Sequence, residues 1–425
     1  KIVHVLVILN CKMKVIFNIC IVLYLLQCNY GFSQNIYSKQ FTTQDGLGDN
    51  MVRSIHKDTR GIMWIGTKNG LSKMKGDRFI TYNLNQTENL EIRGIKEDSR
   101  GILYLLTNDW ISFINCRNES AGRVSFSPKD DSNWGIINFE LQNDSLLWYS
   151  KDTTLILSLT NYDKNTERVY VKKIRSFSFR FETNERIMQF VILEDDKRVC
   201  LVTNHARVFI LDISTGKYFE KTRLVTINGE FNATSILAYD NQIFITSLLY
   251  GIFVLDDTFR LVQQIVNVGD DVLKRKISHN SVYNLIPVGD SSLLAATWNG
   301  YTLLSPSKQN SVVWTTEFLT SILSPGNTKI DLRMLSLYYD KEGYVWIGTH
   351  GGGVLILDWK WRFIKQFDFA EDNEINDIDF VGNQFYLSTY EKGVLCVNDF
   401  ESTDKFISHK LFPAFLPNAA ICSTK

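Results

Sequence analysis

The chain has 425 residues, and its 46 Lys and Arg residues balance 46 Asp and Glu residues, so its formal net charge is zero at pH 7. Hydrophobic residues make up 44% and charged residues 22%, which excludes a disordered or low-complexity chain. The balanced charge gives no electrostatic reason to expect nucleic acid or an anionic membrane as a partner. Aromatic residues reach 13% while Pro is limited to 6 residues, a mixture that favours β-strands.

The leader over residues 1–34 is predicted to end in a secretory signal peptide. A basic residue at position 14 precedes an apolar run over 15–26, as in the charged and apolar regions of such signals. The run is short and is interrupted by Asn18, which favours a cleaved signal over a retained membrane anchor. A lipoprotein signal would use Cys28, but Gln27 is a poor residue before a lipidated cysteine. We therefore expect the mature chain to work outside the cytoplasm, in the periplasm.

One motif recurs along the rest of the chain. Residues 58–67 (DTRGIMWIGT) return as 340–349 (DKEGYVWIGT), with Asp, Gly, Trp, Ile, Gly and Thr in the same places. Weaker copies lie between these two and one more follows, at a mean spacing of about 46 residues. The Thr or Ser that marks the register of each copy stands at Thr67, Thr107, Ser150, Thr203, Thr246, Thr297, Thr349 and Thr389.

Each repeat reads as four short strands. In the seventh unit we expect strands over 332–339, 344–349, 354–358 and 363–367, with a Gly-containing turn between the first two. No stretch shows a sustained 3.6-residue apolar period, so helices should be scarce. Units of four strands and 40–50 residues are typical of β-propeller blades, which bury both sheet faces only when the ring closes.

We therefore predict an all-β protein with a seven-bladed propeller of four-stranded blades over 35–370. Residues 371–425 would then form the first blade of a second, truncated propeller, and a single eight-bladed ring is the alternative. Residues 36–42 read as a strand without a blade of its own, so we expect that strand to complete the last blade. The structural kernel is assigned to Trp64, Gly66, Thr67, Trp346, Gly348 and Thr349: the Trp rings fill the wedge between blades, and the Gly residues mark close backbone approach.

The phrase Trp-Ile-Gly-Thr-x-x-Gly at 64–70, preceded by Asp-x-x-Gly, resembles the two-component regulator propeller repeat. The segment 41–50 (FTTQDGLGDN) also resembles the opening of receptors that carry this repeat. Over about residues 36–400 the chain is similar to the hybrid two-component system sensors of polysaccharide-utilising Gram-negative bacteria. The motifs are strong in the first and seventh units and degenerate between them.

The resemblance implies a periplasmic sensor of two propellers and a small β-sandwich, followed by one membrane helix and cytoplasmic kinase and regulator modules. It implies an oligosaccharide as the ligand. This sequence contains no later membrane span, no phosphoacceptor His box and no ATP-binding glycine motif, so we expect no signalling chemistry in it. We expect a fragment or a truncated product, with any homodimer or membrane contact made through regions outside this chain.

Motifs for catalysis and metal binding are missing from the sequence. It has no HExxH, GxSxG or P-loop, and the cysteines beyond the leader are far apart with no CxxC pair. We therefore expect no enzyme activity, no metal and no cofactor. The alternative is a secreted propeller enzyme, a lyase or glycosidase acting on carbohydrate, with a divalent metal and His205, His279 or His350, because propellers can distribute active-site residues over several blades.

The ligand is expected on one end of the ring. In an up-and-down blade, the loop after the second strand and the loop before the next first strand open on the same side. These loops carry aromatic rings, planar amides and guanidinium groups, the combination that sugars need. The predicted ligand contacts are Asp109, Trp110, His205, Arg207, Tyr250, Trp298, Asn299, His350 and Tyr390. Binding between two propellers is the alternative, and then this chain alone would bind nothing.

Overall fold

The computed structural model describes residues 39–82, 90–108, 110–127, 135–225, 231–267, 277–307, 313–319 and 332–358, and four strands within 375–412. The chain divides into two compact units, 1–363 and 364–425. The predicted leader and the predicted domain boundary at 370 lie outside the described residues. Within the described ranges the one helix is a short 3-10 turn, η1 (Thr43–Asp45), and no helix there is long and apolar enough to cross a membrane.

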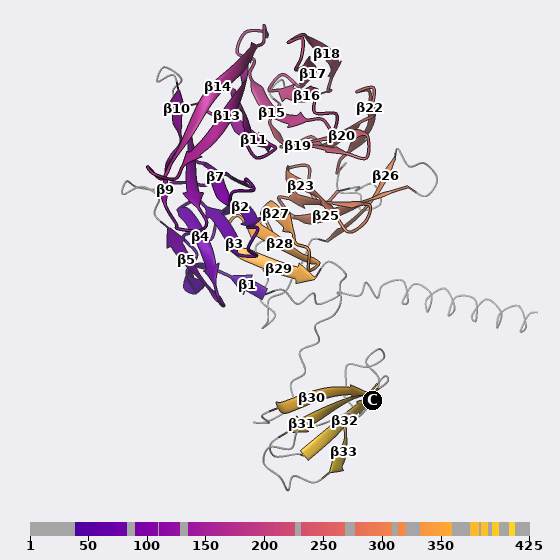
Figure 1. Ribbon diagram of the computed structural model, residues 1–425. Coiled ribbons are helices and arrows are strands. Elements are labelled where there is room, and N and C mark those ends of the chain that lie inside the picture. Colours follow the sequence, from indigo (N-terminus) through magenta and orange to yellow (C-terminus); the bar gives the residue numbers. More distant parts are fainter. Residues whose placement is uncertain are drawn as a thin grey trace, which may run out of the picture. The chain divides into compact units, whose positions relative to one another are not determined.

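Strands β1–β29 of the first unit form seven sheets arranged around a common axis (Figure 1). Blade 1 contains β2 (Val52–Lys57), β3 (Met63–Thr67), β4 (Gly70–Lys75) and β5 (Arg78–Tyr82), and blade 2 contains β6 (Gly94–Glu97), β7 (Ile102–Leu106), β8 (Ile111–Asn115) and β9 (Ala121–Arg123). Blade 3 contains β10 (Ser125–Ser127), β11 (Asn138–Gln142), β12 (Leu146–Lys151), β13 (Thr154–Asp163) and β14 (Arg168–Ser178).

Blade 4 contains β15 (Ile187–Ile192), β16 (Arg198–Thr203), β17 (Arg207–Asp212) and β18 (Tyr218–Arg223). Blade 5 contains β19 (Ala233–Tyr239), β20 (Gln242–Ser247), β21 (Gly251–Leu255) and β22 (Leu261–Ile265). Blade 6 contains β23 (Val282–Val288), β24 (Ser292–Thr297), β25 (Gly300–Pro306) and β26 (Trp314–Leu319). Blade 7 contains β27 (Met334–Tyr339), β28 (Tyr344–Thr349) and β29 (Val354–Asp358), with β1 (Lys39–Phe41) as its fourth strand.

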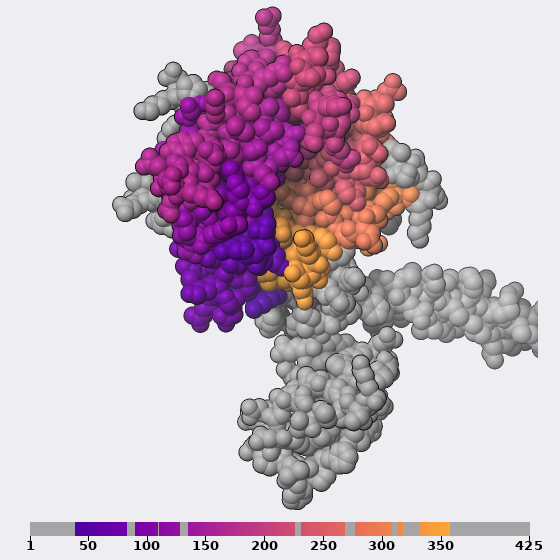
Figure 2. Space-filling model, viewed as in Figure 1, coloured from indigo at the N-terminus to yellow at the C-terminus, as the bar shows by residue number. Residues whose placement is uncertain are grey.

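The ring is closed by the chain start, as predicted. Strand β1 pairs antiparallel with β29, Phe41 opposite Val354, and so holds the outer position of blade 7. The strand predicted over 363–367 lies outside the described residues, and the position beside β29 is occupied by β1. Indigo residues of the chain start and orange residues of blade 7 accordingly lie side by side in Figure 2.

Blade 3 differs from the other six by one strand. Its fifth strand, β10, runs parallel to β14, with Ser125 opposite Tyr170 and Ser127 opposite Lys172. Seven hydrophobic clusters fill the seams between neighbouring blades, including the seam between blades 7 and 1. This closure at seven blades rules out the single eight-bladed ring.

The kernel residues have the packing roles expected from the sequence. Trp64 is fully buried in the seam between blades 1 and 2, and Trp346 is 7% exposed in the seam between blades 7 and 1. A Cβ on Gly66 would collide with Ser54 Oγ and the Ile92 carbonyl, because Ser54 Oγ donates to Ile92 O of the next blade over 3.1 Å. The kernel Gly therefore makes room for a hydrogen bond between blades.

The second unit contains one four-stranded antiparallel sheet in the order β30 (Ile375–Val381), β31 (Gln384–Thr389), β32 (Gly393–Asn398) and β33 (Ser408–Phe412). Its first two strands carry the same register shift near the start of β30 that β2 and β27 carry in the propeller. The eighth repeat is thus a blade-like sheet outside the seven-bladed ring. That it begins a second propeller remains a prediction.

Candidate functional site

The kernel Thr side chains hold the loops on one end of the propeller, here called the loop face. Thr67 Oγ1 donates to the carbonyl of Gly70 over 2.9 Å and accepts the Asn69 amide over 3.1 Å. Thr297 and Thr349 donate in the same way to the carbonyls three and four residues later. Every second strand ends and every first strand begins at this face, so these loops and the segments leading into the first strands lie together there.

Three consecutive blades place aromatic and arginine side chains together at the loop face. The Trp298 ring centroid lies 5.2 Å from the His350 ring in an edge-on contact and 5.7 Å from the Tyr283 ring, and the Arg333 guanidinium lies 5.3 Å from the Trp298 ring. These four side chains, together with Arg53, are called the aromatic–arginine cluster below; all are half-buried.

Backbone geometry fixes where the members of this cluster stand. Tyr283 and Arg53 are the second residues of innermost strands, inside the register shifts between β23 and β24 and between β2 and β3. The His350 amide donates to the Arg333 carbonyl over 2.8 Å, which joins the loop after β28 to the start of β27. Because both bulged residues belong to innermost strands, the cluster lies at the channel end of the loop face.

Burial and a neighbouring positive charge both act on the pKa of the Tyr283 hydroxyl in the cluster. Burial raises the pKa of the Tyr283 hydroxyl, and the nearby Arg53 guanidinium acts in the opposite direction. Arg53 Nε also donates to Glu91 Oε1 over 2.6 Å. At neutral pH the cluster therefore offers a protonated Tyr hydroxyl, three aromatic rings and two guanidinium groups, which can contact a polar ligand that has apolar faces.

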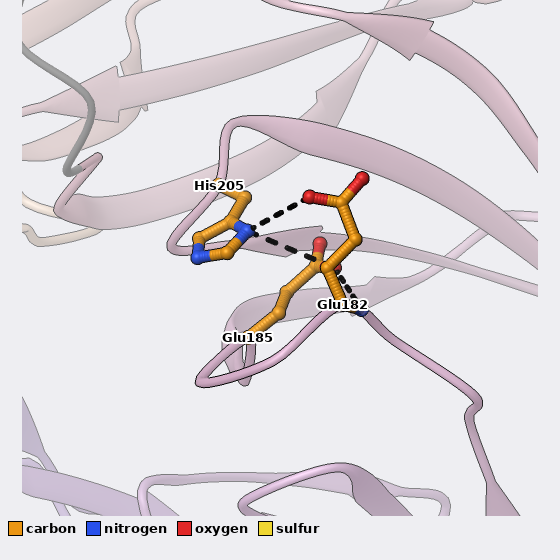
Figure 3. Close-up of side chains that lie close together, drawn as sticks. All are labelled: Glu182, Glu185 and His205. Carbon is orange, nitrogen blue, oxygen red and sulfur yellow. Dashed lines mark hydrogen bonds and ion pairs between the residues drawn. The ribbon is translucent and has the colours of Figure 1, made fainter.

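His205 and Arg207 belong to a second group on the loop face, in blade 4. His205 Nδ1 lies 3.4 Å from Glu182 Oε2 and 4.0 Å from Glu185 Oε2, and both carboxylates come from the segment leading into β15 (Figure 3). Arg207 Nη1 donates to Glu185 Oε2 over 2.8 Å, and its Nε donates to Glu220 over 2.9 Å. The Glu185 side chain is completely buried.

The same group contains the side-chain types that bind divalent metals, since Glu182, Glu185 and His205 have ligand atoms within 4.8 Å of one another. Arg207 and Arg223, however, already supply positive charge to both carboxylates. Glu185 also accepts the Thr203 hydroxyl over 2.5 Å and the Glu182 amide over 2.9 Å. We therefore interpret this group as an ion-pair network that braces the loop after β16.

The other predicted contact residues are dispersed. Trp110 lies under the Arg123 guanidinium of β9, 4.1 Å from it, and donates to Ser112 Oγ, so it covers the outer part of blade 2. Tyr250 is 8% exposed and packs against Phe231 in the seam between blades 4 and 5. Asn299 is an exposed turn residue beside Trp298. Asp109 and Tyr390 lie outside the described residues.

Sequence reasoning placed Trp298 and His350 in the loops but missed Tyr283, Arg333 and Arg53. These three residues lie in or just before innermost strands, and not in the loops that follow second strands. The sequence does contain a signal for them, because the segment before each first strand lies on the same face of the propeller as those loops. His279, the remaining catalytic alternative, accepts the Ser281 amide at Nδ1 over 2.9 Å, as a turn residue does, and burial lowers its pKa.

The sequence matches the two-component regulator propeller family at residues 46–69 and 329–351, the strong repeats of blades 1 and 7. Two repeats of this chain, those of blades 1 and 7, therefore match the two-component regulator propeller repeat. A curated relative, Histidine kinase P4 of Formosa agariphila, is 37% identical over 60 residues, which is 14% of this chain and 4% of that protein. The matched residues are thus a small part of that relative.

Solved structures share the fold. The extracellular domain of the hybrid two-component system BT3049 from B. thetaiotaomicron is 16% identical, with a TM-score of 0.56 over 89% of this chain and 50% of that one. A streptogramin B lyase is 12% identical, with a TM-score of 0.55 over 76% of this chain and 97% of that one. At these identities the likeness concerns the fold, and this chain spans about half of the BT3049 structure.

Proposed function

We propose that the chain is the extracytoplasmic ligand-sensing region of a two-component receptor, and that it recognises an oligosaccharide. The aromatic–arginine cluster is the observation that carries the proposal. The regulator propeller repeats and the fold shared with the extracellular domain of BT3049 support the sensor role. The leader predicted at 1–34 supports a periplasmic location, and the signal would pass to a histidine kinase outside these residues.

The chemistry of the cluster suits a sugar. The CH-rich faces of a pyranose pack against aromatic rings, here Trp298, Tyr283 and His350, while hydroxyl groups pair with planar donors and acceptors. The Arg333 guanidinium offers such donors and the Tyr283 hydroxyl can donate or accept. Because the cluster spans blades 6, 7 and 1, a ligand there would contact both sides of the seam at which the ring closes.

Titration calorimetry of this chain with a panel of oligosaccharides tests the proposal. Trp298→Ala should weaken binding by about tenfold, the size of one lost aromatic contact at a binding site. Trp110→Ala is the matched control, since Trp110 packs over β9. Unchanged affinity in Trp298→Ala would move the site away from the cluster, and no affinity of this chain for any oligosaccharide would overturn the cluster as a carbohydrate site.

A further inference from the structure

A cavity of about 360 Å³ opens between blades 4 and 5 at the end of the propeller opposite the loop face. Its walls come from the turns between first and second strands and from the turn between β21 and β22. The volume is sufficient for a small organic ligand. The loop-face residues named above do not line it, so any binding here would be separate from the aromatic–arginine cluster.

The floor of the cavity is apolar. Leu193, Ile243 and Phe259 line it and are each 7% exposed or less. Phe259 has a φ of 66°, in the left-handed region that a bulky residue rarely adopts. Its amide donates to the Asp256 carbonyl over 2.9 Å and its ring packs in the hydrophobic seam, and these contacts hold the strained turn that presents the ring to the cavity.

The rim of the cavity is acidic. Four carboxylates and one guanidinium line it: Glu194, Asp195, Asp256, Asp257 and Arg198. Arg198 Nε donates to Asp195 Oδ2 over 2.5 Å, so the charge of Asp195 is matched within the rim. Asp256 and Asp257 belong to the turn of blade 5 between β21 and β22, which also carries Phe259. The Arg260 guanidinium is also near and acts to lower the pKa of Asp256. Arg260 does not line the cavity, however.

Hydrogen bonds lower the pKa of two of the rim carboxylates, Asp256 and Asp195, and hold them in place. Asp256 Oδ1 accepts the amides of Arg260 and Thr258, each over 2.9 Å, and these bonds lower its pKa. Burial acts to raise the pKa of Asp195, but hydrogen bonds from the Lys197 and Arg198 amides outweigh it and lower the pKa. An anionic ligand would therefore meet repulsion at this rim, whereas a cation would be attracted.

We propose that this cavity binds a primary amine carried on an apolar body, with the ring or chain on Phe259 and the ammonium group beside Asp256 and Asp257. The apolar floor and the excess of carboxylates complement the two halves of such a ligand. This inference is independent of the oligosaccharide proposal, because it concerns other residues on the opposite end of the propeller.

Ligand-observed fluorine NMR with three matched probes tests this inference: 4-fluorobenzylamine, 4-fluorobenzyl alcohol and 4-fluorobenzoate. The amine should bind more tightly than the alcohol, and the carboxylate should bind least. Asp256→Asn combined with Asp257→Asn should weaken amine binding by about three- to fivefold, the size of a half-exposed charge pair, and leave the alcohol unchanged. The Asn at 256 keeps the Oδ1 acceptor and hence the turn.

Asp290→Asn provides the control, since Asp290 is exposed in the turn between β23 and β24 of blade 6, at the same end of the propeller, and does not line the cavity. Equal binding of the amine and the alcohol would overturn the inference, as would equal weakening by Asp290→Asn or no binding of the amine. Matching melting temperatures confirm that the variants are folded. The oligosaccharide titration should be the same in these variants, which separates the two proposals.

Discussion

The indole nitrogen of Trp64 donates a hydrogen bond to Asp58 Oδ2 over 3.0 Å, and Trp346 repeats this bond to Asp340 at the same distance. Asp58 Oδ1 also accepts the amides of Arg60 and Ile62, which close the turn between the first two strands. The repeated Asp-x-x-Gly-x-x-Trp spacing therefore encodes one local structure, in which the Asp binds both the turn and the Trp ring. A single carboxylate fixes the turn and orients the ring that fills the seam between blades.

Degenerate repeats make an equivalent hydrogen bond to the buried ring with other side chains. The Tyr104 hydroxyl donates to Asp98 over 3.4 Å in blade 2, and Trp148 Nε1 donates to Gln142 Oε1 over 2.7 Å in blade 3. In each case a buried ring carries its polar atom to an acceptor at the end of the first strand. The physical requirement is a hydrogen-bond acceptor for a buried polar ring, which several residue pairs can meet.

Asp58→Ala should lower the free energy of unfolding by about 1–3 kcal/mol, because the buried Trp64 nitrogen and two turn amides lose their acceptor. Chemical denaturation measures the change. Asp77→Ala is the control, since Asp77 is exposed in the turn after β4. A loss of stability that is no larger than in the control would show that the carboxylate does not brace the blade.

Asp58 should also contribute to the acid limit of stability. Burial acts to raise its pKa, but hydrogen bonds from Trp64, the Ile62 amide and Arg60 outweigh burial and lower it. A carboxyl group whose folded pKa is depressed stabilises the protein above its unfolded pKa, near 4, and loses that contribution as the pH falls through the folded value. Asp58→Asn should therefore flatten the decline of melting temperature below about pH 4. An unchanged decline would contradict this.

Arg207→Met should destabilise the protein by about 3 kcal/mol, because the completely buried Glu185 carboxylate would lose its closest cation. The comparison is Arg223→Met, in which both partners of the ion pair with Glu182 are more than half exposed. That change should cost less than about 1 kcal/mol. Equal effects, measured by urea unfolding, would show that the burial of Glu185 does not decide the strength of the network.

Gly66→Ala and Gly348→Ala should each destabilise the protein, because the added Cβ would displace a Ser side chain from the seam with the next blade. Gly76 has open space around it but a φ of 64°, so Gly76→Asn is the fair comparison and should be nearly neutral. Melting temperatures of the three variants decide the matter. Similar values for all three would remove the close-approach role of the kernel Gly.

Phe41→Ala should cost about 3–5 kcal/mol, because Phe41 is 1% exposed and its ring meets Phe79 edge-on at 5.2 Å in the seam that closes the ring. Phe219→Ala on β18, where the ring is 59% exposed, provides the control. Denaturant midpoints measure both changes. Equal midpoints would imply that β1 is dispensable for closing the propeller.

The repeat motif was sufficient to predict the all-β propeller, its seven blades, the completion of blade 7 by the chain start and the buried kernel. Turn residues, strand alternation and the spacing between Asp58 and Trp64 are local features that recur, so they can be read without knowing the fold. The parallel strand β10 was missed, because its three residues gain their pairing only from the distant β14.

The direction of each loop side chain was decided by the tertiary structure alone. Trp110 and Trp298 both follow a kernel Thr within three residues, yet Trp110 lies under Arg123 of an outermost strand and Trp298 lies against Tyr283 of an innermost strand. The neighbours that fix each ring come from residues 13 and 15 positions away or from the next blade. The sequence therefore determined which residues form the loops, whereas packing between strands and blades determined which of them meet at a site.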